Sequence, residues 1–380
     1  MVIGVLGGGQ LGQMLALAGI PLGIEFRFLD PSADSVAGRV GELIVGAYDD
    51  PVCLARLAHG AHAVTFEFEN VPAGAIEWLA RRVPTFPPQA ALAAAQDRVA
   101  EKALFAELGI AIPRLAGVST PDELRAGVER VGVPCVVKTR RMGYDGKGQA
   151  VVRDISEVEE VWTRLGGGGS GGGDGGGGLI VEEFVAFGRE VSIIGVRGRD
   201  GACAFYPLTQ NVHRGGILRQ SIAPAPDSAG LQATAEAYCR AVMERLGYVG
   251  VLAIEFFEKG GVLWANEMAP RVHNSGHWTI EGSICSQFEN HVRAVAGLPL
   301  GETQMAGGPG VGGGSVAGMV NLIGTPLDLI GVLGEAGSHL HWYGKEPRAG
   351  RKVGHVTRCA GSRAELCEWM GRWEGRLAEP

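Results

Sequence analysis

The sequence predicts an α/β protein whose N-terminal region forms a parallel sheet. Through roughly the first 95 residues, apolar strand-like runs alternate with helical patterns, and helices of this kind join neighbouring strands of a parallel sheet. The length of 380 residues exceeds what one hydrophobic core usually covers, so two or three domains are expected. The composition, 46% hydrophobic and 20% charged, is that of a globular protein.

The first predicted domain covers residues 1–95. An apolar strand at the N-terminus runs into a glycine turn and a helix, and further strands are expected at 26–30 and 63–68. A proline cluster, Pro84, Pro87 and Pro88, marks the end of this unit. Because the start lacks a basic segment, it is interpreted as structure and not as a signal peptide. No apolar run is long enough to cross a bilayer, and we expect a cytoplasmic protein.

A second domain is expected at 96–305, with a lid subdomain at about 118–185, followed by a small C-terminal domain at 306–380. The second domain begins with a helix from about Gln96 to Leu108, which Gly109 closes. In the lid, the pattern predicts helices at 121–131 and 155–165 around strands at 133–139 and 149–154. The tract GGGGSGGGDGGGG at 166–178 cannot bury apolar surface, and we expect a flexible loop without function.

Charge and cysteine usage narrow the class of partner. The net charge of −7 argues against a nucleic-acid binder, which needs a clustered basic surface. The seven cysteines are scattered without a C-x-x-C pair, which indicates reduced thiols in a cytosolic protein. Neither nucleic acid nor membrane is therefore expected as a partner.

The N-terminal glycines, Gly7, Gly9 and Gly12, match a dinucleotide-binding pattern, and Asp30 ends the second strand where a ribose-binding acid would lie. The motif is weak, because a helix N-terminus with free backbone N–H groups attracts any anion. Three interpretations stay open: a nicotinamide dinucleotide site, a structural turn, and contact with the phosphate of a substrate.

A second glycine-rich segment follows the strand that ends at Lys138. Glycines in Gly143–Gln149 allow backbone N–H groups to converge on phosphate oxygens, and Lys147 adds positive charge. The segment is not a Walker A loop, since G-x-x-x-x-G-K-[ST] is absent. The alternative is an ordinary hairpin turn with a solvated lysine.

Two glutamates form a candidate magnesium site. VLAIEFF and VLWANEM flank a turn, and a three-residue loop at 259–261 would place Glu255 opposite Ala265, with Glu267 as its diagonal neighbour on the same face. Magnesium binds through one or two carboxylates plus nucleotide phosphates. The alternative is an acid satisfied by a nearby arginine such as Arg271.

At this point the chain resembles the ATP-grasp superfamily, through its lysine-ended strand, its glycine-rich lid loop, an E-E-F-V strand, and an acid followed by N-E. Within it, NEMAPRVHNSGHWTIEGSICSQFENHVRAVAGLPL at 266–300 is similar to the N5-carboxyaminoimidazole ribonucleotide synthetase family. GGGQLGQM, TFEFENVP, GYDGKGQ, YPLTQNVHRGGILRQS and HWYGKEPRAGRKVGH match the family in order. The resemblance covers nearly the whole chain and implies an ATP-grasp fold.

The resemblance also implies the chemistry. ATP would phosphorylate bicarbonate to carboxyphosphate, and the amine of aminoimidazole ribonucleotide would capture the carboxyl group, releasing ADP and phosphate. ATP and Mg²⁺ are the implied cofactors, and a homodimer is expected from the resemblance alone. Because carboxyphosphate is short-lived in water, a closing lid fits this reaction.

The site residues carried over fall into four groups. The implied ATP-binding residues are Arg98, Lys138, Gly143, Tyr144, Asp145, Gly146, Lys147, Gly148, Gln149, Glu182, Glu183, Phe184, Val185, Glu190, His213, Asn266 and Glu267. Those implied for the ribonucleotide and bicarbonate are Gln10, Leu11, Glu67, Tyr144, Lys147, His273, Asn274, Lys345, Arg351 and Lys352. The metal ligands would be Glu255 and Glu267, and the catalytic residues would be Asp145, Lys147, Arg271 and Lys345.

Asp145 is the candidate that orients the attacking amine or accepts its proton, and a turn-forming aspartate is the competing interpretation. A zinc site at His273 and His277 has too few ligands. The rival functions are another ATP-grasp ligase or a formate-using transformylase, an NAD-dependent oxidoreductase, and a non-catalytic nucleotide-binding regulator.

Overall fold

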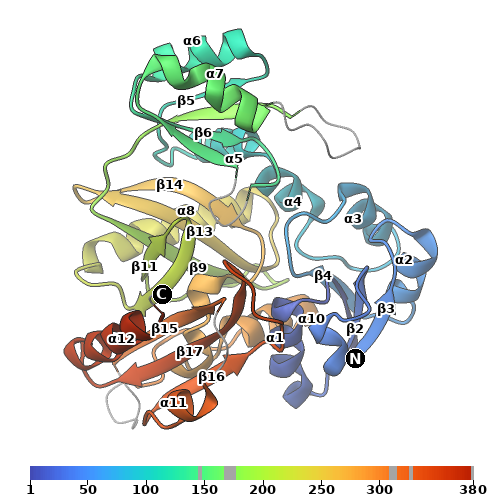
Figure 1. Cartoon of the computed structure of the whole chain (residues 1–380). Coiled ribbons are helices and arrows are strands. Elements are labelled where there is room, and N and C mark those ends of the chain that lie inside the picture. Colours follow the sequence, from blue (N-terminus) through green and yellow to red (C-terminus); the bar gives the residue numbers. More distant parts are fainter. Residues whose placement is uncertain (144–147, 167–176, 308–314, 325–327, 378–380) are drawn as a thin grey trace.

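The computed structural model describes residues 1–143, 148–166, 177–307, 315–324 and 328–377. The predicted glycine tract at 166–178 and the loop residues Tyr144, Asp145, Gly146 and Lys147 lie wholly or largely outside these ranges. In the described part of the chain, three sheets form three regions, with the lid uppermost in Figure 1, the N-terminal region in blue and the C-terminal strands in red.

The N-terminal sheet is parallel, as predicted, and has the strand order β3-β2-β1-β4. Its strands are β1 Val2–Leu6, β2 Glu25–Asp30, β3 Glu42–Val45 and β4 Ala63–Phe66. Its helices are α1 Gln10–Gly19, α2 Pro51–Ala58, α3 Ala73–Ala80 and α4 Gln89–Ala95, with short 3₁₀ turns at Ile20–Leu22 and Val36–Arg39. The strand predicted at 63–68 is shorter in the structure, where β4 ends at Phe66.

The lid is an antiparallel sheet of order β5-β8-β6-β7. Its strands are β5 Leu115–Val118, β6 Cys135–Thr139, β7 Gln149–Val152 and β8 Leu179–Glu183. Helix α6, Pro121–Val131, begins as predicted because the Thr120 hydroxyl accepts a hydrogen bond from the Glu123 N–H. The helix predicted at 155–165 is wrong in type: a 3₁₀ turn Ile155–Glu157, one α turn α7 Val158–Val161 and a π turn Trp162–Gly166 follow one another.

The central sheet has the order β14-β13-β9-β11-β12-β15-β17-β16, with β10 paired to β9. Its strands are β9 Arg189–Arg197, β10 Cys203–Phe205, β11 Thr209–Arg214, β12 Ile217–Ala223, β13 Gly250–Lys259, β14 Val262–Ala269, β15 Val316–Ile323, β16 Ser338–Trp342 and β17 Lys352–Ala360. Since β12 pairs with β15, the C-terminal strands extend the sheet that carries the two glutamates.

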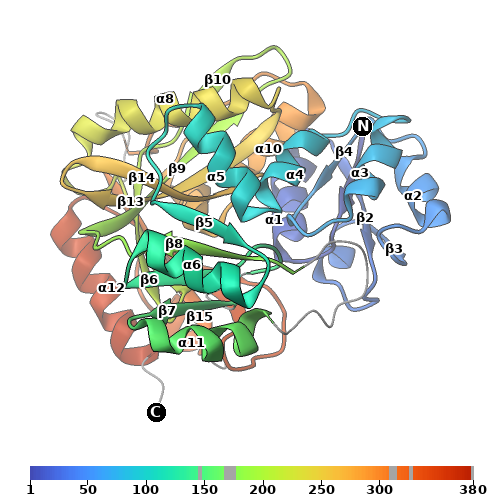
Figure 2. The ribbon, with the colours of Figure 1, turned by 90° about the horizontal axis from the view of Figure 1, so that it is seen from above.

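Helices cover this sheet on both sides. They are α5 Arg98–Glu107, α8 Ala229–Arg245, α9 Thr279–Gly282, α10 Gln287–Ala296, α11 Leu329–Leu333 and α12 Arg363–Leu377, with a 3₁₀ turn at Asn274–Gly276. Helix α5 ends at Glu107, two residues before Gly109, whose φ of +69° agrees with the predicted stop. Helices α5 and α8 both contact the β13–β14 hairpin, and Figure 2 shows them near one another.

The N-terminal region is joined firmly to the central sheet. One buried core cluster contains Ile3 and Phe28 of the first together with Val251 and Val292 of the second. The buried imidazole of His291 bonds the Thr65 hydroxyl at 2.9 Å and accepts from the Val251 N–H at 3.1 Å. The two regions therefore share one interior, which fixes the N-terminal glycine turn relative to the hairpin. None of the helices described has both the length and the apolar character that crossing a bilayer requires.

Trp278 tests the importance of this shared core. The indole is fully buried, packs edge-on against Tyr206 and donates to the Thr209 hydroxyl at 3.0 Å. We expect Trp278→Ala to lower the free energy of unfolding by about 3–5 kcal/mol, since it leaves a cavity. Urea unfolding followed by circular dichroism measures this change. Trp78→Ala on the half-buried face of α3 is the control, and an equal loss there would contradict the prediction.

Candidate active site

The β13–β14 hairpin carries the two predicted metal ligands. Lys259 pairs with Val262, so the loop has two residues, Gly260 and Gly261, and the predicted three-residue loop is wrong. Their φ values of +60° and +80° suit the tight turn that matches strand twist, and glycine adopts such values without strain. With this loop Phe256, and not Glu255, lies opposite Ala265.

A β-bulge then brings the glutamates together. The register shifts between Glu255 and Phe256, because Asn266 is an extra residue on β14. Glu255 consequently lies directly opposite Glu267, a closer relation than the predicted diagonal one. Directly opposed residues of an antiparallel pair share one face of the sheet, so the two carboxylates lie side by side.

The two carboxylates have different electrostatic environments. Burial, and then the charge of Glu267, raise the pKa of Glu255 to about 7. Burial also opposes ionisation of Glu267, but Arg98 and Lys138 outweigh it, and the pKa of Glu267 falls below its usual value. The Arg98 guanidinium lies 3.0 Å from a Glu267 oxygen. Adjacent hard-oxygen donors that repel one another fit a divalent cation such as Mg²⁺.

The competing interpretation, an acid satisfied by a nearby arginine, holds for Glu267 through Arg98 and not through Arg271. Arg271 instead lies 2.5 Å from the Glu69 carboxylate, and this ion pair keeps the pKa of Glu69 low although burial opposes it. Burial lowers the pKa of Arg271, but the charge of Glu69 outweighs this effect and the pKa is raised. The charges of Glu67 and Glu267 raise it further. Arg271 is therefore within electrostatic reach of both the metal pair and the N-terminal region.

A buried group of lysines lies beside Glu255 and Glu267. The Lys138 ammonium at the end of β6 lies 2.6 Å from Glu182 and 3.4 Å from the Asn266 side-chain oxygen. Lys102 lies 3.6 Å from the other Glu182 oxygen. Burial opposes the ionisation of Glu182, but the two lysines lower its pKa to about 2. Glu182, predicted for the adenine strand, thus carries the negative charge that keeps two lysines in the interior.

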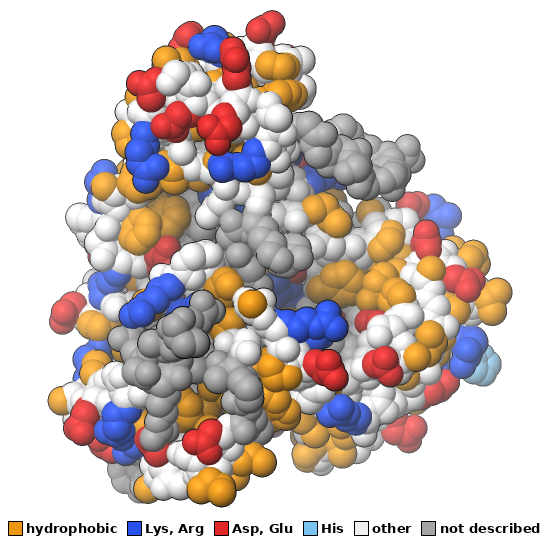
Figure 3. Space-filling model, viewed as in Figure 1, with side chains coloured by type: hydrophobic (Ala, Val, Ile, Leu, Met, Phe, Trp, Pro, Cys, Tyr) orange, Lys and Arg blue, Asp and Glu red, His pale blue; other side chains and the backbone are white. Residues whose placement is uncertain are grey.

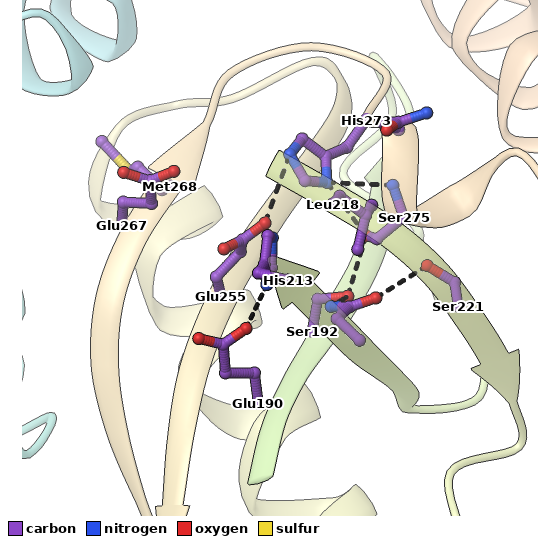
Figure 4. A network of polar contacts seen from close by, with 12 residues as sticks. Glu190, Ser192, His213, Leu218, Ser221, Glu255, Glu267, Met268, His273 and Ser275 are labelled. Atoms are coloured by element: carbon purple, nitrogen blue, oxygen red, sulfur yellow. Dashed lines mark hydrogen bonds and ion pairs between the residues drawn. The ribbon is translucent and has the colours of Figure 1, made fainter. Parts of the chain in front are cut away.

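A directed chain of hydrogen bonds orients His273 (Figure 4). The Asn211 amide donates to Ser192, the Ser192 hydroxyl donates to Ser275, and Ser275 lies 2.9 Å from His273 Nδ1. The Ser275 backbone N–H also points to Nδ1, at 3.3 Å, so this nitrogen is an acceptor. Nε2 then carries the proton and lies 3.4 Å from Glu255. Burial, Arg271 and Lys352 lower the pKa of His273 to about 3, so the ring is neutral.

The remaining predicted nucleotide residues come from the central sheet and from the lid. The His213 imidazole contacts the Glu190 carboxylate, which raises the pKa of His213 although burial lowers it. Glu183 pairs with Arg114 at 2.9 Å, Phe184 is exposed, and Val185 is buried. In the glycine loop, Gln149 pairs with Lys138, and the Gly148 carbonyl accepts from the Thr139 N–H. Gly143 is half-buried.

A cleft of about 760 Å³ opens between the N-terminal region and the C-terminal strands. Its lining includes Asp30, Glu67, Lys345 and Arg351. Figure 3 shows the surface hollowed where the lid, the N-terminal region and the C-terminal strands meet, with Lys and Arg side chains at the margin. The cleft is large enough for a small ligand, and its polar lining supplies both signs of charge.

The glycine turn beside this cleft is already occupied by carboxylates. Asp30 accepts from the Gly8 N–H at 2.8 Å, and Glu67 accepts from the Gly9 and Gly12 N–H groups. These anions would repel a dinucleotide pyrophosphate and have taken its donors. The contacts support the structural-turn interpretation and argue equally against a nicotinamide site and against contact with the phosphate of a substrate.

The C-terminal strands bring further predicted residues to the cleft. The Lys345 ammonium bonds the Gln10 side chain, and half-buried Leu11 packs against the core beside it. Lys352 begins β17, and its charge acts on both Glu255 and His273. Asn274 exchanges amide hydrogen bonds with Asn321 on β15. His277, in contrast, packs against Phe288 and His355. No group of three or more potential metal-binding side chains occurs in the described ranges.

The sequence interpretation missed four charged residues of this site: Glu69, Asp97, Glu101 and Lys102. Asp97 caps α5 and accepts from Arg140 and Arg141 of the lid, at 2.6 and 3.1 Å. Lys102 follows Arg98 by one helical turn, so both project from the same side of α5. That spacing was the available signal.

Three family models match the sequence of this chain. A ribonucleotide synthetase preATP-grasp domain matches residues 1–96, an ATP-grasp domain matches 103–288, and a phosphoribosylaminoimidazole carboxylase C-terminal domain matches 317–368. An N5-carboxyaminoimidazole ribonucleotide synthase of Pseudomonas aeruginosa is 50% identical over the whole chain and 98% of its own length. The chain belongs to the N5-carboxyaminoimidazole ribonucleotide synthase family.

Other members of the N5-carboxyaminoimidazole ribonucleotide synthase family agree. The protein of that name from Bacillus subtilis is 38% identical over 94% of this chain and 90% of its own length. The crystal structure of the Thermus thermophilus synthetase has a TM-score of 0.91 at 52% identity, covering 100% of this chain and 99% of the other. An Aspergillus clavatus member in complex with ADP and 5-aminoimidazole ribonucleotide has a TM-score of 0.85 at 28% identity, covering 96% and 95%. The family is an ATP-grasp ligase family.

Removing the repulsion between Glu255 and Glu267 should stabilise the protein in the absence of metal. When the pKa of a carboxyl is higher in the folded than in the unfolded protein, the free energy of unfolding decreases as pH rises above the unfolded pKa. We expect Glu255→Gln to raise the free energy of unfolding at pH 8 in EDTA by an amount on the order of 1–3 kcal/mol.

The gain should shrink as pH falls toward 5, and thermal unfolding across this range measures it. Glu244→Gln on the exposed side of α8 is the control. A lower unfolding midpoint for Glu255→Gln at pH 8 would contradict the electrostatic argument.

Proposed function

We propose that this protein carboxylates 5-aminoimidazole ribonucleotide with bicarbonate at the expense of ATP. Bicarbonate attacks the γ-phosphorus of ATP to give carboxyphosphate and ADP. The ribonucleotide amine then attacks the carboxyl carbon, loses a proton and expels phosphate, which gives N5-carboxyaminoimidazole ribonucleotide. The observation that carries the proposal is the direct pairing of Glu255 with Glu267 beside a buried group of cations and next to a separate charged cleft.

The nucleotide end of the site is suited to phosphoryl transfer. Arg98 contacts Glu267 and Lys138 contacts the adjacent Asn266, and both cations can neutralise phosphate oxygens as charge develops. Glu255 and Glu267 would hold Mg²⁺, which supplies neutralising charge to the phosphates when it is bound. Glu190 and His213 are candidates for the ribose, and the segment Glu182–Val185 for the adenine.

The bicarbonate position is proposed near His273, Asn274 and Arg271. The hydrogen-bond chain behind His273 keeps Nε2–H as a donor, and the neutral ring does not add charge. Arg271 is held by Glu69, so its guanidinium has a fixed place from which to stabilise the developing carboxylate charge. Asp145 and Lys147 are proposed from the resemblance to act on the amine and on the phosphate.

The cleft lined by Glu67 and Lys345 is the proposed ribonucleotide site. Lys345, Arg351 and Lys352 can pair with a phosphate monoester, while Gln10, Leu11, Glu67 and Tyr144 contact the nucleoside. The relative with bound 5-aminoimidazole ribonucleotide supports this class of substrate. A homodimer that works in the cytoplasm is proposed on the same resemblance, and sedimentation equilibrium tests the dimer.

One assay separates the candidate functions. ADP release is followed with purified protein, MgATP and bicarbonate, with and without 5-aminoimidazole ribonucleotide, and ¹³C-bicarbonate traces the new carboxyl group. Stimulation by the ribonucleotide with ¹³C in the product supports the proposal. Activity that requires formate, or ADP release without dependence on the ribonucleotide, contradicts it.

Glu267→Ala should abolish ribonucleotide-dependent ADP release. Removal of one of two adjacent carboxylates lowers divalent-cation affinity and leaves Arg98 without its partner. We expect a fall in kcat/KM of at least about 100-fold, comparable to the removal of one preorganised electrostatic group. The exposed Glu244→Ala is the control, and unchanged turnover in Glu267→Ala would refute the metal assignment.

Lys345→Met should weaken binding of the ribonucleotide and leave binding of ATP unchanged. The Lys345 ammonium lines the charged cleft together with the N-terminal turn, and it bonds the Gln10 side chain. Loss of a charge-assisted contact of about 1.5–3 kcal/mol predicts a KM for the ribonucleotide that is roughly 10- to 100-fold higher. Steady-state kinetics with each substrate varied provide the measurement. Lys259→Met at the hairpin turn is the control, and a rise confined to the KM for ATP would be inconsistent with this assignment.

A further inference from the structure

The outer edge of β14 is bonded to helix α5 and its following loop, although β14 is the last strand of the central sheet. The Ala265 N–H donates to the Ala111 carbonyl at 2.8 Å. The Lys102 ammonium donates to the carbonyls of Ala265 at 2.9 Å and Asn266 at 2.6 Å. The Met268 N–H donates to a Glu101 carboxylate oxygen at 2.6 Å.

These contacts enclose the bulge residue. In a regular antiparallel strand, successive carbonyls point to opposite edges, so one ammonium would not reach two in a row. The extra residue Asn266 makes this possible, since it interrupts the alternation immediately before Glu267. Lys102 therefore contacts the backbone before Glu267, and Glu101 contacts the backbone after it.

The clamp formed by Glu101 and Lys102 is buried and anchored. The two side chains are 2% and 1% exposed. Glu182 lies 3.6 Å from the ammonium and balances its charge. The helix that carries both residues starts at Asp97, whose carboxylate accepts from two backbone N–H groups of its first turn. Buried polar groups with this many partners have little freedom to move.

We propose that Lys102 and Glu101 are positioning residues that hold the β14 bulge and thereby set Glu267 opposite Glu255 for a divalent cation. They act through the backbone, and Glu255 and Glu267 remain the ligands. The inference rests on the metal assignment proposed above. Residues that orient metal ligands from behind commonly change affinity by about 10- to 100-fold when they are replaced.

Mn²⁺ binding tests this role without reliance on turnover. Free Mn²⁺ is titrated by electron paramagnetic resonance in the presence of saturating ADP, for the wild type and for Lys102→Met. We expect binding at least about 10-fold weaker in the variant, with an unchanged far-UV circular dichroism spectrum. Removal of a positive charge near a cation site favours cation binding by Coulomb's law, so weaker binding reports a change in geometry. Lys259→Met, on the same hairpin but at its exposed turn, is the control.

The outcomes distinguish the inference from the function on which it rests. If the wild type does not bind Mn²⁺ with ADP, the metal assignment itself fails. If the wild type and Lys102→Met bind equally, the clamp is overturned while the metal assignment stands.

If Lys102→Met does not fold, Glu101→Leu tests the other arm, since it removes the acceptor of the Met268 N–H. Glu101→Gln retains that oxygen and should stay within about twofold of the wild type, in line with an isosteric replacement that keeps the bond. Wild-type affinity in Glu101→Leu would also overturn the proposal.

Discussion

Two carboxylates held next to one another in a partly buried place are the constraint around which the site is organised. Glu255 and Glu267 repel, and burial increases the cost of their charges, which is why the pKa of Glu255 rises. An arrangement of this kind persists only when the surrounding backbone enforces it. Here the bulge at Asn266 does so, with Arg98 offsetting part of the negative charge.

Positively charged side chains lie beside Glu255 and Glu267, and carboxylates hold them there. Lys138 and Lys102 share the buried Glu182, and Asp97 connects the start of α5 to two arginines of the lid. Each cation therefore has a carboxylate that keeps it in place before a nucleotide arrives. Fixed charges of this type stabilise a developing phosphoryl charge without reorganising at the moment of reaction. The same contacts connect lid position with the helix that holds the hairpin.

The continuous central sheet explains how a distant part of the chain reaches the site. Strand β15 pairs with β12 and β17 pairs with β15, so the C-terminal strands extend the sheet that begins at the hairpin. Lys345 then meets Gln10 across the cleft, while the shared core fixes the N-terminal turn. The cleft thus brings together Gln10 and Lys345, which are 335 positions apart in the sequence.

The sequence by itself determined the features that depend on local physics. Alternating apolar runs predicted the parallel N-terminal sheet, the pattern at 121–131 predicted helix α6, and Gly109 predicted a helix stop. The motif run at 266–300 indicated the family. The loop residues Tyr144 to Lys147 stay predictions.

Only the tertiary structure decided how the acids meet. A one-residue difference in loop length alters which side chains are opposed, and the bulge that compensates is held by Lys102 and Glu101 from another element. The partners of Glu182 and Arg271 likewise come from distant segments. Such pairings depend on long-range register and burial, and neither is contained in the local pattern of β14.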